Sequence, residues 1–122
     1  MSLFQKLKSE HSTYYRERNR IVRVAMEALQ LSKRSIFDLH RGDKKQAKKN
    51  LASAQEKLES LKTSFTKNPK LEFEGSYRAA VEEFVEAIMF LRHLEKKPFT
   101  AIKGMNVFYE EYLGGLADMT GE

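Results

Sequence analysis

The sequence contains no cysteine, so disulfides, thiolate catalysis and cysteine-type zinc sites are excluded. With two prolines and six glycines in 122 residues, it also lacks the frequent turn signals of an all-β fold. No apolar run approaches the roughly 20 residues of a membrane-spanning helix, and no leader pattern opens the chain. We therefore expect one soluble, cytoplasmic domain over residues 1–122, with a single core built from the 41% of residues that are hydrophobic.

The net charge of +5 is distributed unevenly along the chain. Residues 1–62 carry 15 basic and 7 acidic side chains, whereas residues 63–122 carry 7 basic and 10 acidic ones. A basic half followed by an acidic half favours an anionic ligand and a separate carboxylate-lined site. Well-solvated helix surfaces produce a similar composition, so the charge alone leaves both interpretations open.

Helical periodicity dominates the pattern of apolar residues. Between residues 12 and 41 the apolar side chains keep broadly to a 3.6-residue period, at Ile21, Val22, Ala25, Ala28, Leu29, Ile36, Phe37 and Leu39. Gly42 ends that helix and Asp43 caps a second one, whose apolar stripe continues to residues 68–69. A third helix runs from about residue 73 to 97. A fourth starts after a loop near residues 103–104 and is still helical at Glu122.

These segments predict an all-α fold, an antiparallel helical bundle. The short connection between the first two helices makes them antiparallel neighbours. The third helix is apolar on two sides, and we expect self-association because one short bundle cannot bury both. The fourth helix has no C-terminal capping signal, so we interpret the chain as a C-terminally truncated fragment. The alternative is that its last turn is exposed.

Two glutamates of the third helix are candidates for chemistry. Glu83 and Glu86 are three residues apart and share a face, which also carries Ala87 and Phe90. Carboxylates on a partly apolar face must either protonate or meet a cation. His93, further along this helix, is expected at the surface. A ferritin-like di-iron helix has histidine three residues after its glutamate, where this chain has Met89, so that fold is excluded.

The fourth helix repeats the acidic pattern with Asp118 and Glu122, four residues apart. Gly114 and Gly115 weaken this helix, a cost that is explained if another helix approaches closely there. If that neighbour is the third helix, four carboxylates converge, a donor set suited to Mg²⁺ or Mn²⁺ beside a scissile phosphate. Such spacings also occur on solvated helices, so a structural role for these acids is the alternative.

Basic residues follow the first helix and open the second. Guanidinium groups placed among aromatic residues hold phosphates and stack on unpaired bases. A solvated helix face explains the lysine run at 44–49 well. It explains less well the basic residues that lie among apolar ones, which are Arg20, Arg23, Lys33 and Arg34.

Three stretches of the chain resemble the translin family and, within it, the translin-associated factor X (TRAX-like) branch. They are LSKRSIFDLHR at 31–41, AAVEEFVEAIMF at 79–90 and YLGGLADMTGE at 112–122, of which the last is the most specific. Their order and spacing agree over nearly the whole chain. The short length and the absence of the eukaryotic insertions resemble a prokaryotic, archaeal member.

The resemblance implies an all-α subunit that assembles into a closed homo-octamer with a basic interior. It also implies a Mg²⁺-dependent (or Mn²⁺-dependent) endoribonuclease that acts on single-stranded RNA, with single-stranded DNA as a further ligand. By motif, the catalytic and metal-binding residues fall on Glu83, Glu86, Asp118 and Glu122. The nucleic-acid-binding residues fall on Arg20, Arg23, Lys33, Arg34 and Arg41.

The family continues for several helices beyond the ADMTGE stretch, and this chain does not contain them. We therefore expect a homo-oligomer that can be a dimer, a tetramer or an octamer. Two other functions compete with the nuclease: a non-catalytic module that binds single-stranded nucleic acid through the basic half, and a helical assembly protein with no nucleic-acid role.

Overall fold

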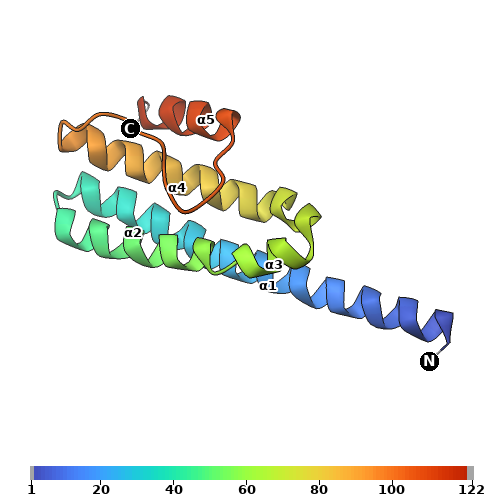
Figure 1. The fold of residues 1–122 in the computed structure, drawn as a ribbon. Coiled ribbons are helices and arrows are strands. Elements are labelled where there is room, and N and C mark those ends of the chain that lie inside the picture. Colours follow the sequence, from blue (N-terminus) through green and yellow to red (C-terminus); the bar gives the residue numbers. More distant parts are fainter. Residues whose placement is uncertain (1, 121–122) are drawn as a thin grey trace.

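The computed structural model describes residues 2–120 and confirms the all-α helical bundle (Figure 1). Its elements are α1 (Leu3–His40), α2 (Lys44–Glu59), α3 (Lys62–Lys67), the short 3₁₀ helix η1 (Pro69–Phe73), α4 (Gly75–Leu94) and α5 (Tyr109–Thr120). Within this range, the side chains outside the description are those of Tyr109, Leu113, Asp118, Met119 and Thr120. None of the described helices combines the length and the apolar character needed to cross a membrane.

The first helix begins well before the predicted residue 12. Ser2 caps it: the Gln5 backbone N–H donates to Ser2 Oγ (3.1 Å), and the Ser2 N–H donates to Gln5 Oε1 (3.0 Å). This reciprocal pair satisfies two free donors and lets the helix start at Leu3. The 38 residues of α1 span about 57 Å, and its first turns project beyond the bundle as an arm (Figure 1).

The predicted turn between the first two helices is confirmed. Gly42 has φ +81°, the left-handed region that glycine enters without a steric cost. Asp43 then caps α2 by accepting a hydrogen bond from the Gln46 N–H at 3.1 Å. The short turn brings α2 back along α1, and the two helices pack against each other. Both carry fully buried alanines, among them Ala28, Ala47 and Ala54.

The second predicted helix is broken where the pattern suggested continuity. α2 ends at Glu59, and the Ser60 hydroxyl donates to the Lys57 carbonyl at 2.6 Å. A separate short helix, α3, then packs Phe65 edge-on against Tyr77, with ring centroids 4.7 Å apart. Apolar spacing does not distinguish one long helix from two collinear short ones, which explains the error.

The third predicted helix, α4, is buried on two sides, as its pattern indicated. α1 and α2 cover one side and α5 covers the other, so the buried residues include Phe84 and Val85 on different faces. The premise that one chain cannot bury both sides is therefore wrong, because the fourth helix does so here. The prediction of self-association must rest on other surfaces.

The fourth predicted helix, α5, starts at Tyr109, several residues later than expected. Residues 95–108 form an irregular connection that returns along the bundle, so α5 runs parallel to α4 (Figure 1). The contacts advance in the same direction along both helices: Arg78 meets Glu111, and further along each helix Val85 meets Gly115. A helix that runs parallel to the preceding helix needs such a long connection, because the chain must first return to the starting end of that helix. An antiparallel helix would need only a short turn.

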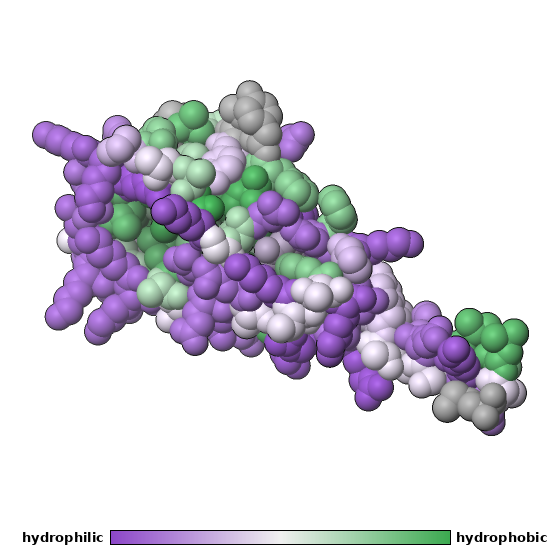
Figure 2. Space-filling view, viewed as in Figure 1, coloured by the Kyte–Doolittle hydropathy of each residue, from purple (hydrophilic) through white to green (hydrophobic). Residues whose placement is uncertain are grey.

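The arm of α1 exposes large apolar side chains. Leu3, Phe4 and Leu7 are 73%, 75% and 56% exposed, and the tip of the arm forms an apolar patch in the space-filling view (Figure 2). A stripe of this kind on a projecting helix favours a helical partner. The arm is thus the surface that now supports self-association.

Candidate functional site

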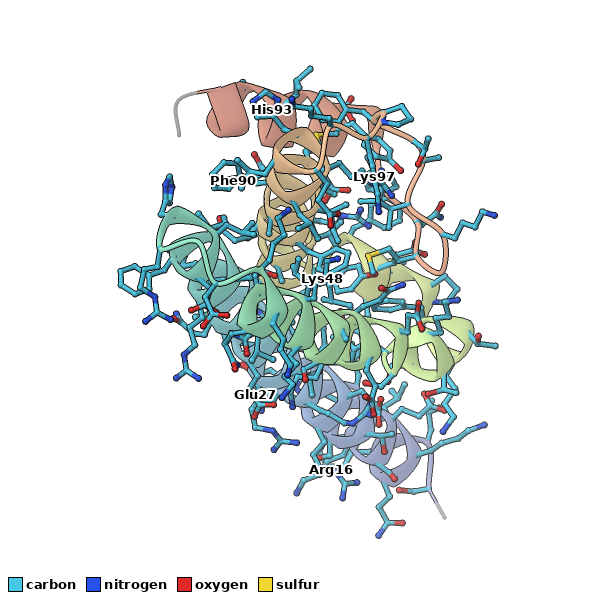
Figure 3. The ribbon with its side chains drawn as sticks, turned by 90° about the vertical axis from the view of Figure 1, so that its left-hand side faces the viewer. Arg16, Glu27, Lys48, Phe90, His93 and Lys97 are labelled. Atoms are coloured by element: carbon cyan, nitrogen blue, oxygen red, sulfur yellow. The ribbon has the colours of Figure 1, made fainter. Side chains whose placement is uncertain are left out.

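The two glutamates predicted on α4 lie where α1 and α5 flank that helix. Glu86 is 6% exposed and Glu83 is half-buried. Glu83 lines a cavity of about 280 Å³ together with four residues of α1, which are Lys33, Ile36, Phe37 and His40. The Phe90 ring, labelled in Figure 3, lies two turns beyond Glu83 on α4, and its centroid is 4.9 Å from that of the His40 ring. The Glu83 side of α4 therefore faces the C-terminal part of α1.

The glycine pair of α5 lets that helix approach α4 closely, as the sequence predicted. A Cβ atom added to Gly115 would lie 2.9 Å from Val85 Cγ1 and 3.1 Å from the backbone nitrogen of Glu86. A Cβ atom added to Gly114 would meet the carboxylate end of Glu82. The two helices thus touch at the turn that carries Glu86, with no room for a side chain at Gly115.

The structure describes less of the other two predicted acidic residues. Asp118 lies on α5, three residues beyond Gly115, but its side chain is outside the described residues, and so is all of Glu122. Over the part of the chain that is described, no group of three or more histidine or acidic side chains comes together as a metal site. The structure therefore brings α5 to the turn of α4 that carries Glu86, and the full four-carboxylate cluster stays a prediction.

The donor chemistry of the described pair fits a hard divalent cation. Glu83 and Glu86 offer carboxylate oxygens, the donors that Mg²⁺ and Mn²⁺ prefer. Burial makes the ionised form of Glu86 costly unless positive charge or hydrogen-bond donors compensate it. A bound divalent cation is one group that can supply such compensation.

Arg78 anchors the start of α5 to α4, a role that periodicity did not reveal. Its guanidinium donates two hydrogen bonds to the Glu111 carboxylate and one to the Asn106 carbonyl (2.8 Å). It also lies 3.7 Å from the centre of the Phe108 ring. Only 15% of the Arg78 side chain and 8% of the Glu111 side chain are exposed. This buried pair holds the long connection and sets the register of α5 on α4.

The predicted basic residues divide between two places on α1. Arg23 and Arg34 line a groove of about 490 Å³ between α1 and α2, together with Lys57 of α2. Glu27 enters the same groove and pairs with Lys57, Nζ to Oε2 at 2.9 Å, which lowers the pKa of Glu27. The three cations outnumber this carboxylate, so the groove suits an anionic ligand. Lys33 instead lines the cavity that contains Glu83.

Two other predicted basic residues have partners within the chain. Arg20 is half-buried and its Nη1 donates to Ser64 Oγ at 2.9 Å, while the Ser64 hydroxyl donates to Glu17 at 2.7 Å. Arg41 donates to Asp38 Oδ1 at 2.7 Å. Arg20 thus links α1 to α3, a structural role that residue counting could not separate from ligand binding.

Phe37 is where the sequence pattern failed most clearly. It is one of the apolar residues that keep to the helical period of the first helix, yet its side chain is 62% exposed, with the Arg41 guanidinium 5.1 Å from its ring centre. The signal that could have identified it is its spacing, three residues after Arg34 and four before Arg41, which puts all three on one helix face. His93, by contrast, is exposed as predicted (Figure 3).

The N-terminus of α4 is fixed by an acidic cap. The Glu74 carboxylate accepts a hydrogen bond from the Ser76 backbone N–H at 3.0 Å and pairs with Arg18 of α1, Nε to Oε2 at 3.3 Å. These two interactions, the backbone hydrogen bond first, hold the pKa of Glu74 below its ordinary value. The ion pair between Glu74 and Arg18 therefore fixes the start of α4 relative to α1.

Comparison with known proteins agrees with this architecture. The model of the Translin family matches residues 16–122. The crystal structure of AfC3PO is similar with a TM-score of 0.87 and 26% identity, over 98% of this chain and 62% of that one. The crystal structure of apo-NeC3PO is similar in fold, with a TM-score of 0.83 and 21% identity, over 99% of this chain and 64% of that one.

No curated protein matches the sequence significantly. The chain spans less than two thirds of the length of the two solved structures. The family match covers most of the chain, including the glutamate-bearing helix and the glycine pair. The chain belongs to the Translin family.

Proposed function

We propose that this chain is the subunit of a metal-dependent endoribonuclease for single-stranded RNA, of the translin-associated factor X type. One observation carries the proposal: α5, which bears Asp118, packs against α4 at the turn that carries Glu86, one turn from Glu83. In this proposal Glu83, Glu86, Asp118 and Glu122 hold Mg²⁺ or Mn²⁺. When bound, such an ion supplies positive charge beside the scissile phosphate and makes a water more acidic.

Basic residues of α1 and α2 bind the RNA substrate in this proposal. Arg23, Arg34 and Lys57 line a groove of about 490 Å³ and bind RNA phosphates there. Lys33 lies in the cavity with Glu83, where its ammonium group holds a phosphate next to the carboxylates. Single-stranded DNA carries the same phosphates and is the second ligand of this surface.

Oligomerisation completes the proposal. The arm of α1 carries the exposed side chains of Leu3, Phe4 and Leu7 away from the bundle. In a homo-oligomer, a second copy of the chain covers these side chains. By its resemblance to the family, we propose that the full assembly is an octamer. Light scattering on the chain tests the self-association. A strict monomer at high concentration would contradict it.

The deciding experiment is a cleavage assay with labelled single-stranded RNA, in Mg²⁺ and in chelator. Glu86→Gln keeps the size of the side chain and removes a charged ligand, so cleavage should fall by orders of magnitude while RNA binding survives. Glu82→Gln, on the same helix but outside the predicted set, is the matched control and should still cleave. Added Mg²⁺ should raise the thermal stability of the parent more than that of Glu86→Gln.

One result would contradict the assignment of the metal ligands, and another would contradict the nuclease itself. If Glu82→Gln and Glu86→Gln lose cleavage equally, the assignment of the ligands is wrong. If the parent binds RNA and shows no cleavage in Mg²⁺ or Mn²⁺, the non-catalytic binding module replaces the nuclease, a function that the basic groove alone supports.

A further inference from the structure

An exposed aromatic ring lies at the edge of the cavity that contains Glu83. Phe37 is 62% exposed, although a phenylalanine gains stability mainly by burial. It lines the same cavity of about 280 Å³ as Glu83, Lys33 and His40. The ring therefore borders the proposed site of cleavage, and the nuclease as proposed gives it no role.

The surroundings of Phe37 are cationic. Lys33, Arg34 and Arg41 lie within one helical turn on either side of it, and all three side chains are exposed. Arg41 is held by Asp38 at 2.7 Å and lies 5.1 Å from the ring centre. An apolar protein partner would have to desolvate these cations, at a cost in free energy. A nucleotide matches the surface better, because its base is apolar on two faces and its phosphates are anionic.

We propose that Phe37 is a stacking platform for one unpaired base of the RNA, next to the phosphate that lies at Glu83. Lys33 and Arg34 hold the phosphates on either side of that base, and Arg41 supports the ring. In a duplex each base is already stacked on its neighbours, so its face is closed to the ring. Phe37 thus selects single-stranded RNA. This inference rests on the proposed function, since it takes Glu83 as the site of cleavage.

The absence of tryptophan from the sequence makes the test direct. Phe37→Trp introduces the one indole of the chain at an exposed position, so folding should be unaffected. Fluorescence is titrated in chelator, which prevents cleavage, with three probes: a single-stranded RNA oligonucleotide, its blunt duplex, and an abasic oligomer of equal charge. The single strand should quench the indole, and the duplex and the abasic oligomer should not.

Affinity provides the second measurement. Phe37→Ala should weaken binding of the single strand by about 5- to 150-fold, the range that base stacking covers. Phe37→Leu keeps the apolar volume and should lose nearly as much, whereas Phe37→Trp should bind as well as the parent. Phe99→Ala, which removes another exposed ring from the connection before α5, should leave affinity unchanged.

The platform and the nuclease can fail separately. If the parent cleaves RNA but the single strand does not quench the indole, or quenches it no more than the duplex does, the platform is wrong and the nuclease stands. If fluorescence responds to protein concentration rather than to RNA, Phe37 is a contact between copies and the platform is wrong. If quenching occurs without any cleavage in Mg²⁺, the nuclease fails.

Discussion

The glycine pair of α5 offers a test in which the same substitution has opposite effects at adjacent positions. Both residues lie within a helix at ordinary negative φ, since neither is among the glycines with positive φ. Replacing either by alanine should therefore stabilise the helix itself by about 1 kcal/mol. What differs is what the added methyl group meets on α4.

At Gly115 the methyl group would lie 2.9 Å from Val85 Cγ1 and 3.1 Å from the Glu86 backbone nitrogen. The backbone of α4 cannot move aside, so α5 must shift outward, an overpacking cost of about 1 to 3 kcal/mol. At Gly114 the methyl group meets only the flexible end of Glu82, which can rotate away. We expect Gly115→Ala to destabilise the fold by up to about 2 kcal/mol and Gly114→Ala to stabilise it by up to about 1 kcal/mol.

Urea denaturation of the parent and the two variants measures this difference. The two midpoints should lie on opposite sides of the parent, with similar slopes if the same surface is exposed on unfolding. Gly115→Ala should also cleave RNA less than Gly114→Ala, since it displaces the helix that carries Asp118. Equal stability of the two variants would refute the reasoning, because it would mean that α5 does not pack on α4 at Gly115.

Three further outcomes follow from the charges. Arg78→Met should cost about 3 kcal/mol in urea denaturation, because it leaves the Glu111 carboxylate buried without its cation; a loss as small as that of a surface pair would count against the anchor. Glu74→Gln should make the fold less sensitive to acid. Because the pKa of Glu74 is lower in the folded state, its carboxylate stabilises the fold at a pH above the ordinary pKa of glutamate. The parent loses this stabilisation as the pH falls through the folded-state pKa, whereas the variant has none to lose. Parallel acid denaturation curves for parent and variant would show that the cap contributes nothing. Removing two of the three groove cations, with Arg23→Ala and Arg34→Ala, should reduce the slope of log affinity for single-stranded RNA against log salt by about 1.4. An unchanged slope would mean that RNA binds elsewhere.

The sequence determined the helices and the location of the acids on them. A 3.6-residue period reports which face of a segment is apolar, and this was sufficient to predict that α1, α2 and α4 exist, although not where each one begins and ends. It could not report that α1 starts at Leu3, because a capping box is a short polar signal outside the apolar pattern. The close approach at Gly114 and Gly115 was also predictable, since paired glycines inside a helix cost stability that only packing explains.

The tertiary structure decided which helices are neighbours and what each side chain faces. Periodicity carries no direction, so it could not show that α5 runs parallel to α4, which follows from the long connection fixed by Arg78 and Glu111. Nor could it separate Arg20, held by Ser64, from Arg23, which faces the groove. Phe37 shows the physical reason: the apolar stripe of an isolated helix is wider than the surface its neighbours cover, and only their placement leaves this ring outside the core.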